Sequence, residues 1–249
     1  MRQTVIQLEQ FYASRMGAAA KAMVTRRLDN LWPDLSGRDV LGYGYAWPYL
    51  EDYAEQTHRT VLAMPGEQGA LAQAGRRGII TCLTEDARLP FADASFDDVL
   101  VAHGAEETPD LHLLLSELWR VTRPEGRIVV MASNRSGLWA GSDSSPFGAG
   151  RPFSRSQLRG ALKAAGFLPT VWSGALFVPP SRRLSSPGIV RGCERFGETV
   201  CPSFSGVVLV EALKRLYAES SGKSARLVMR PSFGSAPIGS RASQRNKKA

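Results

Sequence analysis

One strand–helix–strand unit constrains the fold of this 249-residue chain more than any other feature of its sequence. Residues 97–103 read DDVLVAH, a mostly apolar run of strand length, and a Pro-Glu-Gly turn leads into a second such run at residues 127–132. Between them, residues 110–121 have helical spacing of apolar positions, with Leu111, Leu114, Leu115, Leu118 and Trp119 on the core side. Two apolar strands joined by an amphipathic helix predict a parallel sheet that is covered on both faces.

The same alternation continues on both sides of this unit. Upstream, the pattern predicts a helix over residues 5–32, strands at 38–43, 60–64 and 78–82, and helices at 47–56 and 67–74. Downstream, a long loop at 133–153 is of a length often used for binding. The Ser-Arg-Ser-Gln capping box at 154–157 then predicts a helix that ends at Gly166. Two further strands are expected around 168–178 and 204–210, with an Arg-rich helical stretch between them.

Charge is distributed unevenly along the chain. Residues 151–249 hold 17 Lys and Arg against 4 Asp and Glu, whereas residues 1–150 hold 14 against 19. A basic C-terminal half favours an acidic partner, although a solvated tail that only aids solubility is the simpler alternative. Nucleic acid is a weaker candidate because residues 220–249 offer a single aromatic, Phe233, for base stacking. This tail is poor in large apolar residues, so we expect it to be disordered.

The sequence predicts a cytoplasmic protein without a membrane span. It has no run of eighteen apolar residues, and its N-terminus has no uninterrupted apolar region of the kind found in secretory signals. The three cysteines, Cys82, Cys193 and Cys201, are too few and too scattered for a disulfide framework. Cys193 and Cys201 lack metal-ligand spacing and a nearby His, so no metal site is predicted.

Three stretches of the chain resemble the class I S-adenosylmethionine-dependent methyltransferases of the type 11 group. LTEDARLPFADASFDDVLVAH, residues 83–103, is similar to the family segment in which an acid and its neighbour contact adenine before the fourth strand. LLSELWRVTRPEGRIVV, residues 114–130, resembles the family's next helix, Pro-Gly turn and fifth strand, and QLRGALKAAGF, residues 157–167, its following helix and turn.

The resemblance implies an α/β, Rossmann-like fold with S-adenosylmethionine as its cofactor. The implied sheet has seven strands, mostly parallel with the last one antiparallel, and helices on both faces. We expect three parts: an N-terminal helical segment (1–37) that packs on the core, a methyltransferase-like domain (38–219), and the basic tail (220–249).

The chain departs from the family at the glycine-rich loop after the first strand, where residues 40–50 read VLGYGYAWPYL. The family's acid and three spaced glycines align there with Gly42, Gly44, Ala46 and Pro48, so only one glycine is retained. Glycine lets the backbone approach a ligand without a Cβ, and Pro48 suits the first turn of a helix. The loop resembles a variant subgroup with a Gly-Tyr-Ala-type turn. Tyr45 or Trp47 would then lie over the cleft, and would either stack on the ligand or fill its pocket.

Two further cofactor contacts follow from the resemblance. The family places an acid after the second strand for the ribose hydroxyls, but Met64 or Pro65 stands there, and the nearest carboxylate is Glu67. Glu67 is a candidate contact, with stabilisation of a helix N-terminus as the alternative. Asp86 and the Ala87 amide are assigned to adenine, with a simple turn cap as the alternative for Asp86. The predicted cofactor-binding residues are Gly42, Gly44, Tyr45, Glu67, Asp86 and Ala87.

Candidate catalytic and substrate residues follow the fourth and fifth strands, whose carboxyl ends are where open α/β sheets bind ligands. His103 is the candidate base or substrate contact, or a structural residue. Asn134, Arg135 and Trp139 are candidates for a planar or anionic substrate, with Trp139 as a plug of the sheet edge being the alternative. The sequence therefore predicts a methyltransferase of a small molecule or a protein. The alternative is a non-catalytic relative that binds a partner protein or another ligand through the same cleft.

Overall fold

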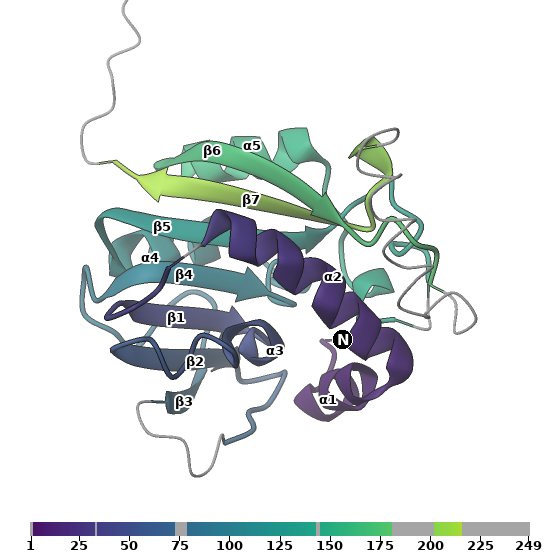
Figure 1. Ribbon diagram of the computed structural model, residues 1–249. Helices are drawn as coiled ribbons and strands as arrows, with labels where there is room; N and C mark the ends of the chain where they lie inside the picture. Colours follow the sequence, from purple (N-terminus) through teal and green to yellow (C-terminus); the bar gives the residue numbers. More distant parts are fainter. Residues whose placement is uncertain (1, 33, 73–78, 143–144, 181–201, 216–249) are drawn as a thin grey trace, which may run out of the picture. The chain divides into compact units, whose positions relative to one another are not determined.

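The computed structural model describes residues 2–32, 34–72, 79–142, 145–180 and 202–215, and within them seven strands form one sheet (Figure 1). Their order is β3-β2-β1-β4-β5-β7-β6. β7 runs antiparallel to both of its neighbours and all other pairs are parallel, which confirms the predicted fold class. The strands are β1 (Asp39–Gly44), β2 (Arg59–Pro65), β3 (Ile79–Thr84), β4 (Phe96–Ala102), β5 (Thr122–Ser133), β6 (Phe167–Ala175) and β7 (Val207–Lys214).

Helices cover both faces of the sheet, as the apolar strands require. One buried cluster joins the sheet to α1 (Val5–Ala13), α2 (Arg15–Leu31) and α3 (Trp47–Leu50). The other joins it to α4 (Leu111–Val121) and α5 (Arg155–Ala164), which lie behind the sheet in Figure 1. Within β5, Val129 and Met131 point into the first cluster, and Ile128 and Val130 into the second, as strand alternation dictates. Two 3₁₀ turns, η1 (Pro146–Gly148) and η3 (Pro202–Phe204), complete the described elements.

Three predicted helices are corrected by the structure. The expected helix over 5–32 is broken at Ser14, whose hydroxyl accepts from Gly17 N and begins α2 as a new helix. The helix expected over 47–56 ends at Leu50 and continues as turns. Residues 67–72 form no helix, since after Pro65 the backbone closes a turn that leaves Gly69 at φ +81°. The capping box of Ser154 and Gln157 is confirmed at α5.

Several expectations concern residues outside the described ranges. These are Cys193, Cys201, the Arg-rich stretch before the last strand, and the tail at 220–249. None of the helices that the structure describes is long and apolar enough to cross a membrane.

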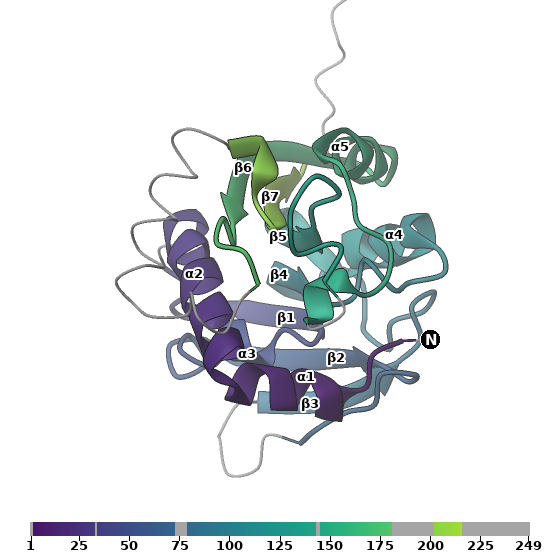
Figure 2. The ribbon, with the colours of Figure 1, turned by 90° about the vertical axis from the view of Figure 1, so that its right-hand side faces the viewer.

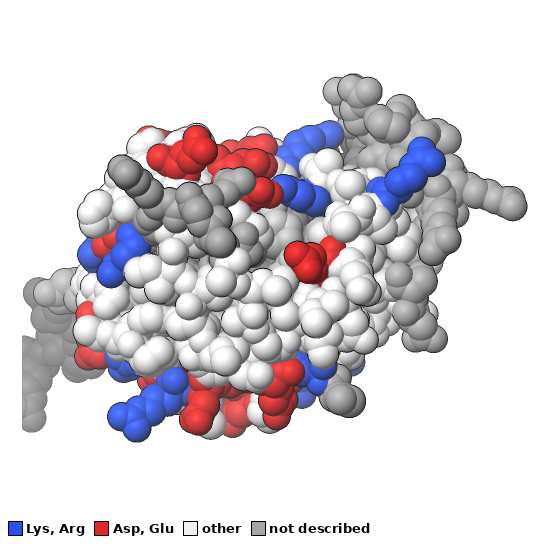
Figure 3. All heavy atoms as spheres, turned by 90° about the horizontal axis from the view of Figure 1, so that it is seen from below, with Lys and Arg blue, Asp and Glu red and all other residues white. Residues whose placement is uncertain are grey.

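β3 forms one edge of the sheet and exposes apolar side chains there. Ile80 is 52% exposed and Leu83 57%. Figure 3 views the molecule from the side on which β3 and α1 lie in Figure 1, and its charged residues gather mainly toward the rims of an uncharged band. The β3 edge of the sheet therefore combines backbone N–H and C=O groups that pair with no further strand with apolar side-chain surface.

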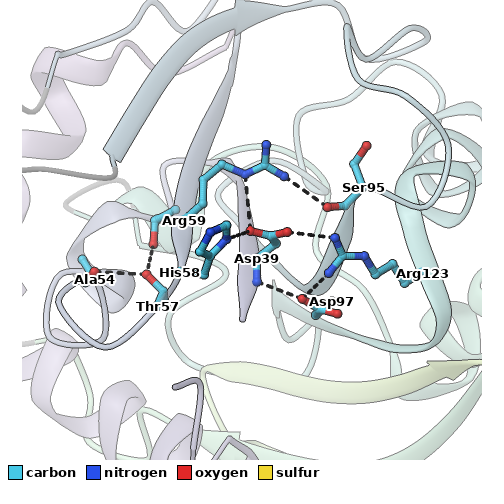
Figure 4. A network of polar contacts seen from close by, with 9 residues as sticks. Asp39, Ala54, Thr57, His58, Arg59, Ser95, Asp97 and Arg123 are labelled. Atoms are coloured by element: carbon cyan, nitrogen blue, oxygen red, sulfur yellow. Dashed lines mark hydrogen bonds and ion pairs between the residues drawn. The ribbon is translucent and has the colours of Figure 1, made fainter. Parts of the chain in front are cut away.

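A network of charged groups holds the amino ends of β1 and β4 together, opposite the candidate site (Figure 4). Asp39 accepts from His58 Nδ1 at 2.7 Å and from Arg123 Nη2 at 2.8 Å. Arg123 also donates to Asp97, which in turn accepts from the Asp39 backbone N–H. Burial opposes ionisation of Asp39, but the hydrogen bonds from His58 and Arg123 outweigh it and lower its pKa.

Asp98 offers a test of how much such pairing contributes. It is fully buried and accepts from Arg38 Nε at 2.6 Å and Arg127 Nε at 2.7 Å. We predict that Asp98→Ala lowers the free energy of unfolding in urea by about 3 kcal/mol, because both guanidinium groups lose their carboxylate. The control is Asp93→Ala, since Asp93 is 79% exposed and its pair with Arg120 is expected to contribute about 1 kcal/mol or less. Equal losses from the two variants would contradict the prediction.

Candidate functional site

The carboxyl ends of the parallel strands meet at one edge of the sheet, which faces the viewer in Figure 2. β1 lies between β2 and β4, so the chain leaves β1 toward one side of the sheet and later returns on the other. Ligands bind at such a switch point in open α/β sheets. The loops after β1, β3 and β4 bring Tyr45, Asp86 and His103 to this edge.

The glycine turn after β1 is tightly filled by protein. Gly44 has φ +75°, and a Cβ there would lie 2.3 Å from the Ala102 carbonyl oxygen, so only glycine fits. A Cβ on Gly42 would lie 2.7 Å from Leu50 Cδ1 and 3.0 Å from Leu62 Cδ2. The space that the family's acid would need at position 42 is therefore occupied by leucine side chains. Pro48 lies in the first turn of α3, as expected.

The aromatic side chains of this turn are all buried. Tyr43 points into the α4 side of the sheet and donates to Asp86 Oδ1 at 2.6 Å. Tyr45 packs against Tyr12 of α1 with ring centroids 5.8 Å apart, and burial raises the pKa of Tyr45 to about 12. Trp47 lies in the same cluster as Tyr45 and is 8% exposed. Between stacking on a ligand and filling the space over the turn, this packing favours the second.

Asp86 is bound by a residue from the far N-terminus. Arg2 donates Nη1 to Oδ1 at 3.0 Å and Nη2 to Oδ2 at 2.6 Å, a two-pronged ion pair in which the Arg2 side chain is 3% exposed. Burial alone would raise the pKa of Asp86, but the hydrogen bonds from Arg2 and Tyr43 outweigh it and lower the pKa. The sequence alone did not predict this ion pair, because 84 residues separate Arg2 from Asp86.

The residues that follow Arg2 continue across the same edge. The backbone N–H of Gln3 donates to both carboxylate oxygens of Glu107, at 2.9 and 3.2 Å. The N–H of Val5 donates to the Gln68 carbonyl at 2.8 Å, and the Gln68 side chain donates to the His103 carbonyl at 3.1 Å. The N-terminal segment thus joins the loops after β2, β3 and β4.

His103 lies in a buried chain of hydroxyl groups. Its Nε2 is 2.6 Å from the Tyr12 hydroxyl, which is 2.6 Å from the Tyr49 hydroxyl. The backbone of His103 has φ +50°, a conformation that costs energy for a residue with a side chain. Burial lowers the pKa of His103 to about 3, so the imidazole is neutral at physiological pH. A base with so low a pKa is poorly matched to work near neutrality, and the catalytic role of His103 stays a prediction.

Glu106 titrates closer to neutrality, and it was not among the predicted site residues. Its Oε1 accepts from the Ser133 N–H at 2.8 Å and the Ser133 hydroxyl at 3.2 Å, while its buried Oε2 has no partner in the described structure. Burial raises the pKa of Glu106 to about 7, although the bonds from Ser133 oppose the shift. The sequence did offer one indication of Glu106, because a carboxylate three residues after His103 lies in the loop that follows β4.

The other predicted cofactor residues lie at the rim of this edge. Glu67 is exposed, and Met64 and Pro65 at the end of β2 are buried, so no carboxylate lies in the ribose position of the family. Ala87 is exposed within a turn that Arg88 N closes onto the Glu85 carbonyl at 3.3 Å. The roles assigned to Glu67 and Ala87 stay predictions.

The three substrate candidates lie on the loop after β5, and two of them make hydrogen bonds within the protein. Asn134 Nδ2 donates to the Ser205 carbonyl at 2.7 Å, and Arg135 is exposed on the same loop. Trp139 is 2% exposed and its Nε1 donates to the Val178 carbonyl at 2.6 Å. Its ring contacts Phe147, which in turn contacts His103, with centroid distances of 5.5 and 5.0 Å. Of the two alternatives for Trp139, this burial favours the plug.

Comparison with known proteins points to one family. Residues 39–130 match the family model described as a methyltransferase domain, of type 11. Residues 39–130 therefore resemble a type 11 methyltransferase domain. The demethylmenaquinone methyltransferase of Mycolicibacterium paratuberculosis is 42% identical over 111 residues, 41% of this chain and 48% of that protein. That of Corynebacterium glutamicum is 40% identical over 69 residues, 28% and 30% of the two chains. The chain therefore spans less than half the length of these curated relatives.

Solved methyltransferase structures share the fold across most of the chain. A methyltransferase from Thermotoga maritima, described as S-adenosylmethionine-dependent, has a TM-score of 0.61 at 16% identity and covers 85% of this chain and 96% of its own. The Haloferax volcanii methyltransferase solved in complex with the Trm112 activator has a TM-score of 0.60 at 15% identity, with coverage of 84% and 97%.

In the conformation of this structure, three contacts that the resemblance implies for S-adenosylmethionine are not available. Leucine side chains fill the space for an acid at Gly42, and β2 ends without a carboxylate. Both oxygens of Asp86 are bound by Arg2. The first two differences are built into the sequence and the core, whereas the third depends on one side chain.

The filled space at Gly42 leads to a prediction about restoring the family's acid. Gly42→Asp is expected to lower the free energy of unfolding by about 3 kcal/mol or more, because it crowds Leu50 and Leu62 and buries a carboxylate without a partner. Gly42→Ala, which adds the Cβ alone, is expected to cost about 1–3 kcal/mol. Chemical denaturation of both variants is the measurement. A stable Gly42→Asp protein would show that the leucines yield and that the position remains open to an acid.

The raised pKa of Glu106 predicts a pH dependence of stability. The Glu106 carboxyl keeps its proton in the folded protein but ionises near pH 4.5 in the unfolded chain. The free energy of unfolding therefore falls as the pH rises from about 4.5 to 7. Glu106→Gln removes this loss, and we expect it to gain about 1–3 kcal/mol relative to wild type between pH 5 and pH 8. Urea unfolding at the two pH values measures it. The same relative stability at both would mean that Glu106 ionises normally.

Proposed function

We propose that this chain is an S-adenosylmethionine-dependent methyltransferase of a small, planar, largely apolar acceptor. The observation that supports the activity is the match of residues 39–130 to the type 11 methyltransferase domain, within a sheet of the family's topology. Asp86, two residues after β3, stands where the resemblance implies the family's adenine contact. A non-catalytic role of the same fold remains the alternative that the experiment below tests.

The acceptor class is inferred from the lining of the carboxyl edge. Tyr12 and Phe147 lie within 5.7 Å of the His103 ring by centroid distance, and Phe11 packs against both of them. A cluster of aromatic rings in edge-to-face and tilted contact presents apolar surface that suits a flat, apolar molecule. The partial relatives act on demethylmenaquinone, and this favours a quinone-type acceptor for this chain as well.

The chemistry requires a dry site more than a fixed set of catalytic groups. Methyl transfer from a sulfonium depends on alignment and on exclusion of water. The buried hydroxyl groups of Tyr12 and Tyr49, together with neutral His103, supply hydrogen-bonding groups away from solvent. Glu106, with a pKa of about 7, is our candidate to accept a proton from an acceptor hydroxyl.

Calorimetric titration with S-adenosylmethionine and S-adenosylhomocysteine tests the activity. We predict measurable but weak binding, since each missing charge-assisted hydrogen bond costs about 1.5–3 kcal/mol, or roughly ten- to hundredfold in affinity. Transfer of a labelled methyl group to a reduced naphthoquinone with an unsubstituted ring carbon tests the acceptor class. The absence of heat with both ligands at about millimolar concentration would favour the non-catalytic alternative.

A further inference from the structure

We propose that Arg2 and Gln3 form an N-terminal latch that occupies the adenine end of the cofactor site and must leave before the cofactor binds. The inference rests on the proposed function and extends it to the control of that site. Arg2 binds both oxygens of Asp86, the acid to which the resemblance assigns the adenine contact. A cofactor and the Arg2 guanidinium therefore compete for the same carboxylate.

The latch is held by polar contacts, and the helix behind it is anchored separately. Arg2 and Gln3 contact Asp86 and Glu107 through hydrogen bonds. In α1, by contrast, Val5 and Leu8 are buried in the core cluster. Opening at Arg2 and Gln3 therefore requires no loss of apolar packing in α1.

A capping box separates the latch from α1. Thr4 Oγ1 accepts from the Gln7 N–H at 3.4 Å, and Gln7 Oε1 accepts from the Thr4 N–H at 2.9 Å. These bonds satisfy the first turn of α1 without help from Arg2 or Gln3. The helix can keep its start at Thr4 while the two preceding residues move, which makes Thr4 the hinge.

The closed latch is also incompletely satisfied. Arg2 Nε is buried and has no hydrogen-bond partner in the described structure. A buried guanidinium nitrogen without a partner costs free energy, so the closed state is less stable than the ion pair alone would make it. A ligand can displace the latch only if the closed state is not too stable, and the unpartnered Nε limits that stability.

The test compares S-adenosylhomocysteine binding by the full-length protein and three variants. Arg2→Ala is expected to bind about ten- to hundredfold more tightly than wild type, because the ligand no longer displaces a charge-assisted pair. Arg2→Lys keeps the charge but loses the two-pronged geometry, so an intermediate affinity is expected. The matched control is Arg15→Ala, which removes the same charge from an exposed position at the start of α2 and should bind as wild type does.

Amide hydrogen exchange of the wild-type protein gives a second readout that needs no variant. Addition of S-adenosylhomocysteine should speed exchange of the Gln3 N–H, which loses Glu107, and leave the amides of α1 unchanged. Slower exchange at Gln3 would mean that the segment closes over a bound ligand, and equal affinities of wild type and Arg2→Ala would show no competition. Either result overturns the latch while leaving the methyltransferase intact. Absence of binding in all four proteins overturns the proposed function, and the latch with it.

Discussion

The desolvated ion pair between Arg2 and Asp86 is the interaction on which the arrangement of the candidate site depends. While the Arg2 guanidinium is almost fully removed from water, it needs the Asp86 carboxylate as its partner. The pair fixes the chain's N-terminus over the switch point of the sheet, and Gln3 and Val5 then reach the loops that carry Glu107 and Gln68. The edge where an α/β sheet binds ligands is thus closed by the protein itself.

Two kinds of departure from the family meet at this edge, and they differ in reversibility. At Gly42 the space for an acid is filled by Leu50 and Leu62, side chains that also pack in the core, so a change there disturbs the fold. At Asp86 the acid is present, and it is bound by the Tyr43 hydroxyl and by the long side chain of Arg2. The first departure changes which contacts a cofactor can make, whereas the second changes when it can make them.

The sequence predicted those parts of the molecule that depend on local pattern. The apolar runs of β4 and β5 and the leucine face of α4 lie within a few residues of each other, so periodicity alone identified them. It failed at residues 67–72, where helix-compatible residues follow a turn at Pro65, and where Gln68 is buried and donates to the His103 carbonyl. It also could not place Arg2 or Tyr12, because contacts across 84 and 91 residues leave no trace in local spacing.

The two ends of α1 connect the closed edge to the chemistry beneath it. Its N-terminal side leads to Arg2 at Asp86, and Tyr12 near its C-terminal end joins Tyr49 and His103. Because Tyr12 is partly buried and packs against the rings of Phe11, Tyr49 and His103, the second contact belongs to the core and the first does not. A helix fixed at one end by packing and continued at the other by a polar segment can open the adenine end while keeping the acceptor end dry. That separation matters for methyl transfer, since the cofactor must enter from solvent but the reacting groups must be kept from it.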